Sequence, residues 1–376
     1  MSPRGRITFP HMGNLWVGTK CVFEELGYDV VVPPPITQRT ISLGSSNSPE
    51  EMCVPFKYVI GNFIEALEKG ADTIFMAGGI GPCRFGLYGI TSELILKRLG
   101  HNPKFVIVEP PAGRIVGFFW QLLKISGFKP KRIVPAIRYA AKKIEAVDWA
   151  EEEFVLKRRP YQKHRRQLDR LYQKYVNRID KADGYEAIDK LKSEFAEEIN
   201  SEVPIDPDKP VLSVMLTGEI FVLLEPYSNM DLARRLGDLG CICLRSSSAT
   251  EWLEERIMPF LFRKPGEKFH YQVAIEKAEP WLKTPFGGEG IETVGYVVIA
   301  KERGHDGVIQ VMPFTCMPEV TAKDVLPKVA REMDIPFYSF IFDEHTAEAG
   351  FQTRVESFVA RMWDVKKKKG MVGSGV

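Results

Sequence analysis

The chain has 376 residues, of which 44% are hydrophobic and 27% are charged, proportions typical of a soluble globular protein. Its 51 basic and 49 acidic residues give a formal net charge of +2, so there is no global signature of a nucleic-acid or membrane-surface protein, and neither partner is expected. The length exceeds one ordinary core, so two or three domains are expected. No signal-peptide region or membrane-spanning apolar stretch is found, so a cytoplasmic protein is expected.

The first part of the chain alternates short β-branched runs with helical runs. Ser48 is the predicted N-cap of a long helix, with Pro49 at its first position and Glu51 completing a capping box. Such alternation predicts a mostly parallel sheet with helices on both faces. The predicted strands are 6–10, 28–32, 72–77 and 105–108, and the predicted helices are 15–26, 49–69, 87–99 and 116–125.

A segment without strand-like runs, 145–200, is rich in Lys, Arg, Glu and Tyr and predicts a helical insertion or linker domain. The alternation then resumes, with strands at 211–216, 241–244, 307–312 and 337–342 and helices at 232–239, 251–261, 325–333 and 353–363. The sequence therefore predicts an α/β protein with two Rossmann-like lobes. The predicted domains are an N-terminal lobe at 1–144, a helical insertion at 145–206 and a C-terminal lobe at 207–376.

Three of the six cysteines lie in turns rich in proline or glycine, where a strand should hand over to a helix. They are Cys53, Cys83 and Cys316, and none belongs to a CxxC pair. Three thiols that lie in separate turns indicate a metal cluster assembled from distant parts of the fold. The first two would come from one lobe and the third from the other, with the cluster in the cleft between the lobes. A local likeness between Cys53-Val-Pro55 and Cys316-Met-Pro318 also suggests two similar lobes.

Other interpretations of the cysteines stay open. A buried core role suits Cys21, Cys241 and Cys243, because a lone cysteine is usually a core residue. Three cysteines and one histidine could instead hold zinc, with His11, His305 and His345 as candidates that otherwise bond to the backbone of tight turns.

Several motifs together resemble the 2-hydroxyacyl-CoA dehydratase superfamily, in its branch of acyl-CoA dehydratase activase-related, double-cubane-like proteins. The motifs are Thr8-Phe-Pro-His11-Met-Gly-Asn14, Ser48-Pro-Glu-Glu-Met-Cys53-Val-Pro-Phe-Lys57, Gly81-Pro-Cys83-Arg-Phe-Gly86, Gly218-Glu219, Pro313-Phe-Thr-Cys316-Met-Pro-Glu319 and Asp343-Glu-His-Thr346 with Thr353-Arg354. The resemblance runs nearly end to end and is weakest across 145–200.

This resemblance implies an oxygen-sensitive iron–sulfur cluster bound by Cys53, Cys83 and Cys316. The cluster would be a 4Fe–4S centre, or part of a double cubane whose remaining thiolates come from elsewhere, because Cys21, Cys241 and Cys243 match no ligand motif. It also implies a separate ATP-hydrolysing iron–sulfur activator as electron donor, a related subunit as a possible dimer partner, and a small molecule or CoA thioester as substrate.

Other residues are candidates for supporting roles. Glu219 follows a predicted strand and is a candidate acid or base, or else a hydrogen-bonded structural carboxylate. Arg84 could bond to cluster sulfides, or form a salt bridge. The basic run 157–170 could meet CoA phosphates, or be a solvated helix face.

The first functional hypothesis is thus an iron–sulfur dehydratase or reductase component that performs reductive or radical chemistry. The second is a non-catalytic electron-transfer or assembly partner of such a system. The third is a zinc-stapled binding protein.

Overall fold

The computed structural model describes residues 5–79, 81–109, 115–284 and 286–370. Its contacts divide the chain into two compact units. Unit 1 comprises Met1–Glu145, Ile179–Ile188 and Ala249–Phe262, and unit 2 comprises Ala146–Arg178, Asp189–Ser248 and Arg263–Val376. The domain boundaries 1–144, 145–206 and 207–376 remain a prediction, since compactness of contacts is a different criterion from independent folding.

Unit 1 is built on a four-stranded parallel sheet with the order β2-β1-β3-β4. Its strands are β1 (Arg6–Thr8), β2 (Asp29–Val30), β3 (Thr73–Ala77) and β4 (Lys104–Val108). Its helices are α1 (Leu15–Glu25), α2 (Gln38–Asn47), α3 (Val54–Glu68), α4 (Tyr88–Arg98), α5 (Ile115–Ile125) and the short α11 (Ala249–Glu251) and α12 (Pro259–Phe262), with 3-10 turns η1 (Arg84–Leu87) and η2 (Pro130–Arg132) and a π-helical turn η5 (Trp252–Ile257).

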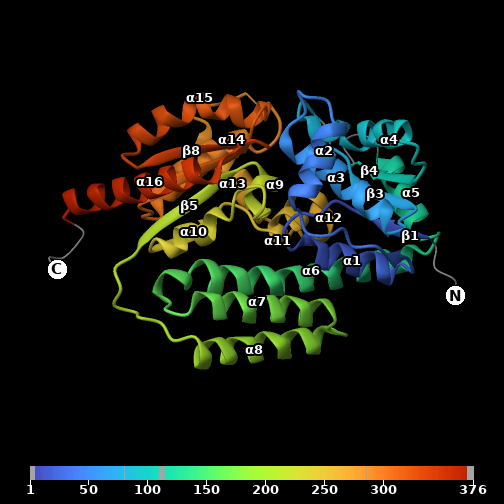
Figure 1. Cartoon of the computed structure of the whole chain (residues 1–376), viewed down its shortest axis with the longest axis horizontal. Coiled ribbons are helices and arrows are strands. Elements are labelled where there is room, and N and C mark those ends of the chain that lie inside the picture. The colour runs from blue at the N-terminus through green and yellow to red at the C-terminus, as the bar shows by residue number, and fades with distance from the viewer. Residues whose placement is uncertain (1–4, 80, 110–114, 285, 371–376) are drawn as a thin grey trace. The chain divides into compact units, whose positions relative to one another are not determined.

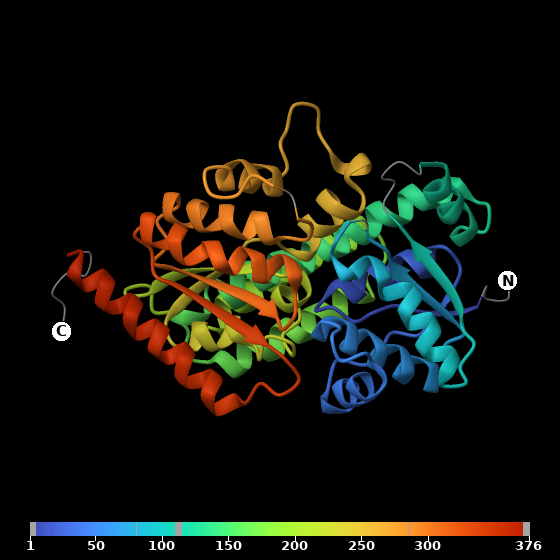
Figure 2. The same ribbon diagram turned by 90° about the horizontal axis from the view of Figure 1, so that it is seen from above.

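Unit 2 repeats the same plan, with a parallel sheet in the order β6-β5-β7-β8 (Figure 1). In Figure 2 the orange and red strands β7 and β8 run in the same direction. The strands are β5 (Leu212–Gly218), β6 (Cys241–Arg245), β7 (Gly307–Pro313) and β8 (Phe337–Phe342). The helices are α9 (Ile220–Leu224), α10 (Leu232–Asp238), α13 (His270–Ala278), α14 (Gly290–Glu302), α15 (Met317–Glu332) and α16 (Glu348–Lys368). Two parallel sheets flanked by helices confirm the predicted α/β fold with Rossmann-like lobes.

The predicted insertion is helical, as expected. It contains the end of α6 (Ile133–Ala150), which begins before the predicted boundary, and then η3 (Glu151–Leu156), η4 (Arg159–Tyr161), α7 (Arg165–Asp180) and α8 (Tyr185–Glu202). Within unit 2, α7 and α8 lie side by side (Figure 1), where the rings of Tyr175 and Phe195 stack at 4.4 Å between centroids.

Each sheet buries its own hydrophobic core. In unit 1, β1 supplies Ile7 and α1 supplies Phe23 to one cluster of buried residues. In unit 2, β7 supplies Val308 and the largely buried α14 supplies Val294 and Val297 to another. Strands covered on both faces explain why the sequence shows continuous apolar runs rather than alternation.

Helix α2 was not predicted, and it packs unusually close to α3. A Cβ atom at Gly61 would lie 2.0 Å from the carbonyl oxygen of Thr40, and one at Gly44 would lie 1.7 Å from that of Lys57. Two glycines on facing helices therefore let the backbones approach. In the described part of the chain, no helix combines the length and the apolar character needed to cross a membrane.

Candidate functional site

The carboxyl ends of two central strands mark the candidate site in each unit. Both sheets have the same order, so the connection changes direction between β1 and β3 in unit 1 and between β5 and β7 in unit 2. Parallel α/β sheets bind ligands at such switch points. Cys83 follows β3 and Cys316 follows β7, which are equivalent strands. The topology therefore makes Cys316 the counterpart of Cys83, although the local sequence likeness linked it to Cys53.

Cys53 is the N-cap of α3, and this corrects the predicted start of that helix. Ser48 is the C-cap of α2 and not an N-cap, and the helix begins at Val54. Pro55 explains the start, because proline fits the first turn of a helix, where amide groups have no intrahelical partner. The Cys53 side chain is buried, and its Sγ lies 2.7 Å from the hydroxyl oxygen of Tyr88.

The Cys83 turn lies against the Cys53 turn. Cys83 is the N-cap of η1, and Tyr88, which contacts the Cys53 sulfur, begins the next helix, α4. Arg84 donates a hydrogen bond from Nη1 to the carbonyl oxygen of Glu51. Unit 1 thus brings Cys53 and Cys83 onto adjoining loops. A hydrogen bond from Arg84 to cluster sulfides remains a prediction; in this structure its guanidinium links the two loops.

Cys316 is the N-cap of α15, a second correction to a predicted helix start. The helix begins at Met317, eight residues before the predicted start at Val325. Pro318 lies in its first turn, and Pro327 is accommodated inside the helix. The Cys316 side chain is buried, and its carbonyl oxygen accepts a hydrogen bond from the Val320 amide at 2.9 Å.

All three cysteines therefore occupy the same backbone position. Cys53, Cys83 and Cys316 are N-caps with extended backbone, with φ between −62° and −69°, and none caps its helix through its side chain. A helix N-terminus carries a partial positive charge, which favours a thiolate or another anion.

Glu219 is also an N-cap. Its Oε2 accepts a hydrogen bond from the Val222 amide at 2.9 Å, at the start of α9. Burial raises the pKa of its carboxyl to about 7, although amides of Val222 and Phe221 lower it in part. Gly218 precedes it with a φ of +134°, and a Cβ there would lie 1.9 Å from the carbonyl oxygen of Val311. The structure thus shows a capping role for Glu219, and its catalytic role remains a prediction.

Glu319 is a site residue for which the sequence suggested no role. It lies one turn after Cys316 and is fully buried. Thr293 donates to its Oε1 at 3.0 Å, and the Gln310 amide donates to its Oε2 at 2.7 Å. Burial raises its pKa to about 8, and the carboxylates of Glu219 and Glu292 add to the increase. Its place in the Cys316-Met-Pro318-Glu319 motif was the sequence signal that could have identified it as a site residue.

The other cysteines lie in the core. Cys21, Cys241 and Cys243 are all buried, on α1 and β6. Burial raises the pKa of the Cys21 and Cys241 thiols to about 12 and also raises that of Cys243. Such thiols resist ionisation, so these positions fit the core interpretation better than that of a thiolate ligand.

The three histidines considered as zinc ligands each contact a different residue. His305 Nδ1 lies 2.7 Å from the Ser213 hydroxyl, and burial lowers the pKa of its ring. The amide of His11 donates to Asn62 at 3.2 Å, and the amide of His345 donates to Asp343 at 2.9 Å. Among the residues that the structure describes, no three or more His, Cys, Asp or Glu side chains are arranged to hold a metal ion. The cluster with its three ligands therefore stays a prediction.

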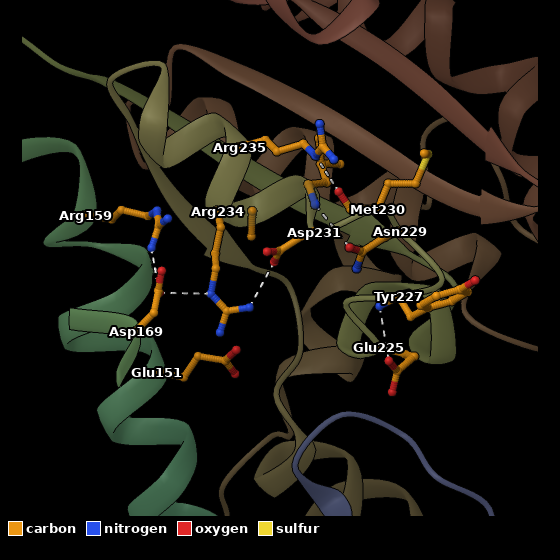
Figure 3. A network of polar contacts seen from close by, with 12 residues as sticks. Glu151, Arg159, Asp169, Glu225, Tyr227, Asn229, Met230, Asp231, Arg234 and Arg235 are labelled. Atoms are coloured by element: carbon orange, nitrogen blue, oxygen red, sulfur yellow. Dashed lines mark hydrogen bonds and ion pairs between the residues drawn. The ribbon is translucent and has the colours of Figure 1, made fainter. Parts of the chain in front are cut away.

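The basic run 157–170 contributes to an internal ionic network in unit 2. Arg159 is buried and donates to Asp169 at 2.7 Å and to Asp238 at 2.8 Å. Figure 3 shows Asp169 between Arg159 and Arg234. At least Arg159 is thus used structurally and is not available to CoA phosphates.

A deeper pair belongs to the same network. Arg245 and Glu151 are both almost fully buried, with 2.7 Å between Nη2 and Oε2. Burial alone would raise the pKa of Glu151, but Arg245 and Arg234 outweigh that effect and hold it below the usual range.

The comparisons with known proteins point to one family over part of unit 1. Residues 11–78 match the family model of the CoA enzyme activase uncharacterised domain (DUF2229). The matched segment includes Cys53 but ends before Cys83 and Cys316. No functionally curated protein matches the sequence significantly. Over these 68 of its 376 residues, the chain is therefore similar to the CoA enzyme activase uncharacterised domain.

Proposed function

We propose that this chain is an iron–sulfur protein of the 2-hydroxyacyl-CoA dehydratase type, with Cys53, Cys83 and Cys316 as ligands of a 4Fe–4S cluster. When bound, such a cluster exchanges single electrons at low potential for a reductive or radical reaction on a small molecule or CoA thioester. The match of residues 11–78 to a domain of CoA enzyme activases supports a system of this kind.

The observation that carries the proposal is the shared position of the three cysteines. Cys53 and Cys316 are the N-caps of α3 and α15, Cys83 is the N-cap of the 3-10 turn η1, and Cys83 and Cys316 follow equivalent strands. The helix N-termini would stabilise anionic thiolates, and the Tyr88 hydroxyl, 2.7 Å from the Cys53 sulfur, could donate a hydrogen bond to one of them. Thiolate sulfur is the donor that iron–sulfur clusters use, and the shared N-cap position of the three cysteines supports the proposal.

The electron would come from an ATP-hydrolysing iron–sulfur activator. The structure offers an apolar face for docking beside Cys83: Leu87, Ile90 and Leu94 are each more than half exposed and share one side of η1 and α4. Exposed apolar residues at such spacing are typical of a surface that a partner covers. Docking here would place the donor close to the Cys83 turn.

The test is the iron, sulfide and zinc content of the anaerobically purified chain and of its serine variants. We expect iron and sulfide in the wild type and their loss in Cys53→Ser, Cys83→Ser and Cys316→Ser. Cys241→Ser is the matched control, because its thiol is buried in the core, and should keep its iron. Full iron and an unchanged visible spectrum in Cys83→Ser would contradict the ligand assignment, and zinc in place of iron would contradict the cluster.

A further inference from the structure

A surface of unit 1 combines exposed aromatic rings with basic residues. It lies at the end of α5 and the start of α6, next to the edge strand β4 (Figure 1). Its members, all exposed, are Trp120, Lys124, Phe128, Lys129, Lys131, Arg132, Val134 and Arg138, and we call them the aromatic–basic surface. Trp120 and Phe128 meet edge to face at 5.8 Å between ring centroids, and Lys124 Nζ lies 5.8 Å from the Trp120 ring centroid.

The sequence segment that forms this surface carries basic residues and no acidic ones. The segment 110–144 contains eight of the 51 basic residues and none of the 49 acidic ones, so the rest of the chain, with 43 basic and 49 acidic residues, has a net charge of −6. The net charge of +2 conceals this asymmetry. Within the described part of the chain, Lys129, Lys131, Arg132 and Arg138 have no ion-pair partner.

The backbone holds the aromatic residue outward at a conformational cost. Phe128 has a φ of +61°, which is rare for a bulky side chain, and it is 62% exposed. Its amide donates to the carbonyl oxygen of Leu123 at 2.8 Å, and the Ser126 hydroxyl accepts from the Lys129 amide at 3.2 Å. A strained turn that fixes an aromatic ring in solvent has no role in the core, which points to an external contact.

We propose that the aromatic–basic surface binds peripherally to an anionic phospholipid membrane. Trp and Phe side chains enter the boundary between headgroups and acyl chains, while Lys and Arg attract anionic headgroups. A lipid leaflet is uniformly anionic, whereas protein surfaces intersperse both signs. A surface formed by a 35-residue segment that contains eight basic and no acidic residues therefore fits an anionic leaflet better than a protein partner. The contact is independent of the proposed cluster.

The experiment is co-sedimentation of the full chain with two kinds of vesicle, phosphatidylcholine alone and an equimolar mixture with phosphatidylglycerol. We expect binding to the mixed vesicles that weakens as salt is added, and little binding to phosphatidylcholine. The variant Lys131→Glu/Arg132→Glu should bind about 30-fold more weakly or worse, because each cation near the surface contributes about 1 kcal/mol. The matched control Lys264→Glu/Lys283→Glu changes the net charge equally at exposed positions of unit 2 and should bind more tightly than that variant.

Phe128→Gly separates a membrane role from a folding role. Glycine suits a φ of +61°, so the free energy of unfolding should stay the same or rise while vesicle binding falls. Equal binding to both kinds of vesicle, no binding to the mixed vesicles, or unchanged binding by Lys131→Glu/Arg132→Glu would each overturn the proposal. An acidic protein as the natural occupant would give the second of these results.

Discussion

Glu319 shows how strongly one buried carboxyl can couple the stability of unit 2 to pH. Burial raises its pKa from 4.5 to about 8; hydrogen bonds from Gln310 and Thr293 lower it in part, and the nearby Glu219 and Glu292 add a smaller increase. Between these two pH values the unfolded state loses its proton while the folded state keeps it. The folded state is therefore favoured at acidic pH, and stability is lost as the pH rises toward 8.

The variant Glu319→Gln tests this coupling. The free energy of unfolding is measured with urea at several pH values. The value for the variant minus that for the wild type should increase by roughly 1 kcal/mol for each pH unit between 4.5 and about 8. At the acidic end both side chains are neutral, so the difference there isolates the effect on packing. A difference that does not change with pH would mean that the Glu319 carboxyl is already ionised in the fold.

The Glu151–Arg245 pair gives a second prediction at the residue scale. Both side chains are less than 10% exposed, so Arg245→Met leaves Glu151 charged and buried and should cost about 3–5 kcal/mol. The double variant Glu151→Leu/Arg245→Met should recover part of that loss, because no unpaired charge remains. The exposed pair Lys268–Glu276 is the control, where Lys268→Met should cost about 0–1 kcal/mol. Urea unfolding measures all three, and equal losses at both pairs would contradict the argument.

At the scale of elements, proline and glycine decide where the helices start and how closely they pack. Pro55 and Pro318 each lie in the first turn after a cysteine N-cap, which is why α3 and α15 begin directly after Cys53 and Cys316. The capping pattern at Ser48 predicted a different start for α3. That prediction was wrong because 38–47 forms its own helix, which ends at Ser48.

The contact between α2 and α3 should be sensitive to a single methyl group. Gly61→Ala would place Cβ about 2.0 Å from the Thr40 carbonyl oxygen, so the helices must move apart, at a cost of about 1–3 kcal/mol. Gly117→Ala in α5 is the control, since no atom lies within 4 Å of its Cβ position, and it should stabilise by roughly 0.5–1 kcal/mol. Thermal unfolding checks both variants, and a neutral Gly61→Ala would show that α2 can shift freely.

For the whole molecule, the proposed function predicts how the chain is reduced. A cluster held by anionic thiolates in apolar surroundings should have a low potential, so ordinary donors should reduce it poorly. We expect full reduction, followed by visible and electron paramagnetic resonance spectra, only with an iron–sulfur activator and ATP. The variant Leu87→Glu/Leu94→Glu should slow that reduction, because it places charge on the apolar face beside Cys83. Equal rates with a mild donor alone would contradict the need for an activator.

The sequence by itself determined the alternation of strands and helices along the chain, the α/β class and the turns that carry the cysteines. These features are local: β-branched runs, glycine and proline act through the backbone of a few residues, so their effect can be read without a partner. Cys53, Cys83 and Cys316 were found in this way, and all three proved to be helix N-caps.

Only the tertiary structure decided which residues face one another. It showed that Cys53 and Cys83 lie on adjoining loops and that Cys316 is the counterpart of Cys83. It also showed that the buried Arg159 forms ion pairs within the protein. It also showed that Glu319, which the sequence marked only as part of a motif, is a buried carboxyl. Burial, pKa and pairing all depend on groups from distant strands and helices, and no local pattern specifies how those groups converge.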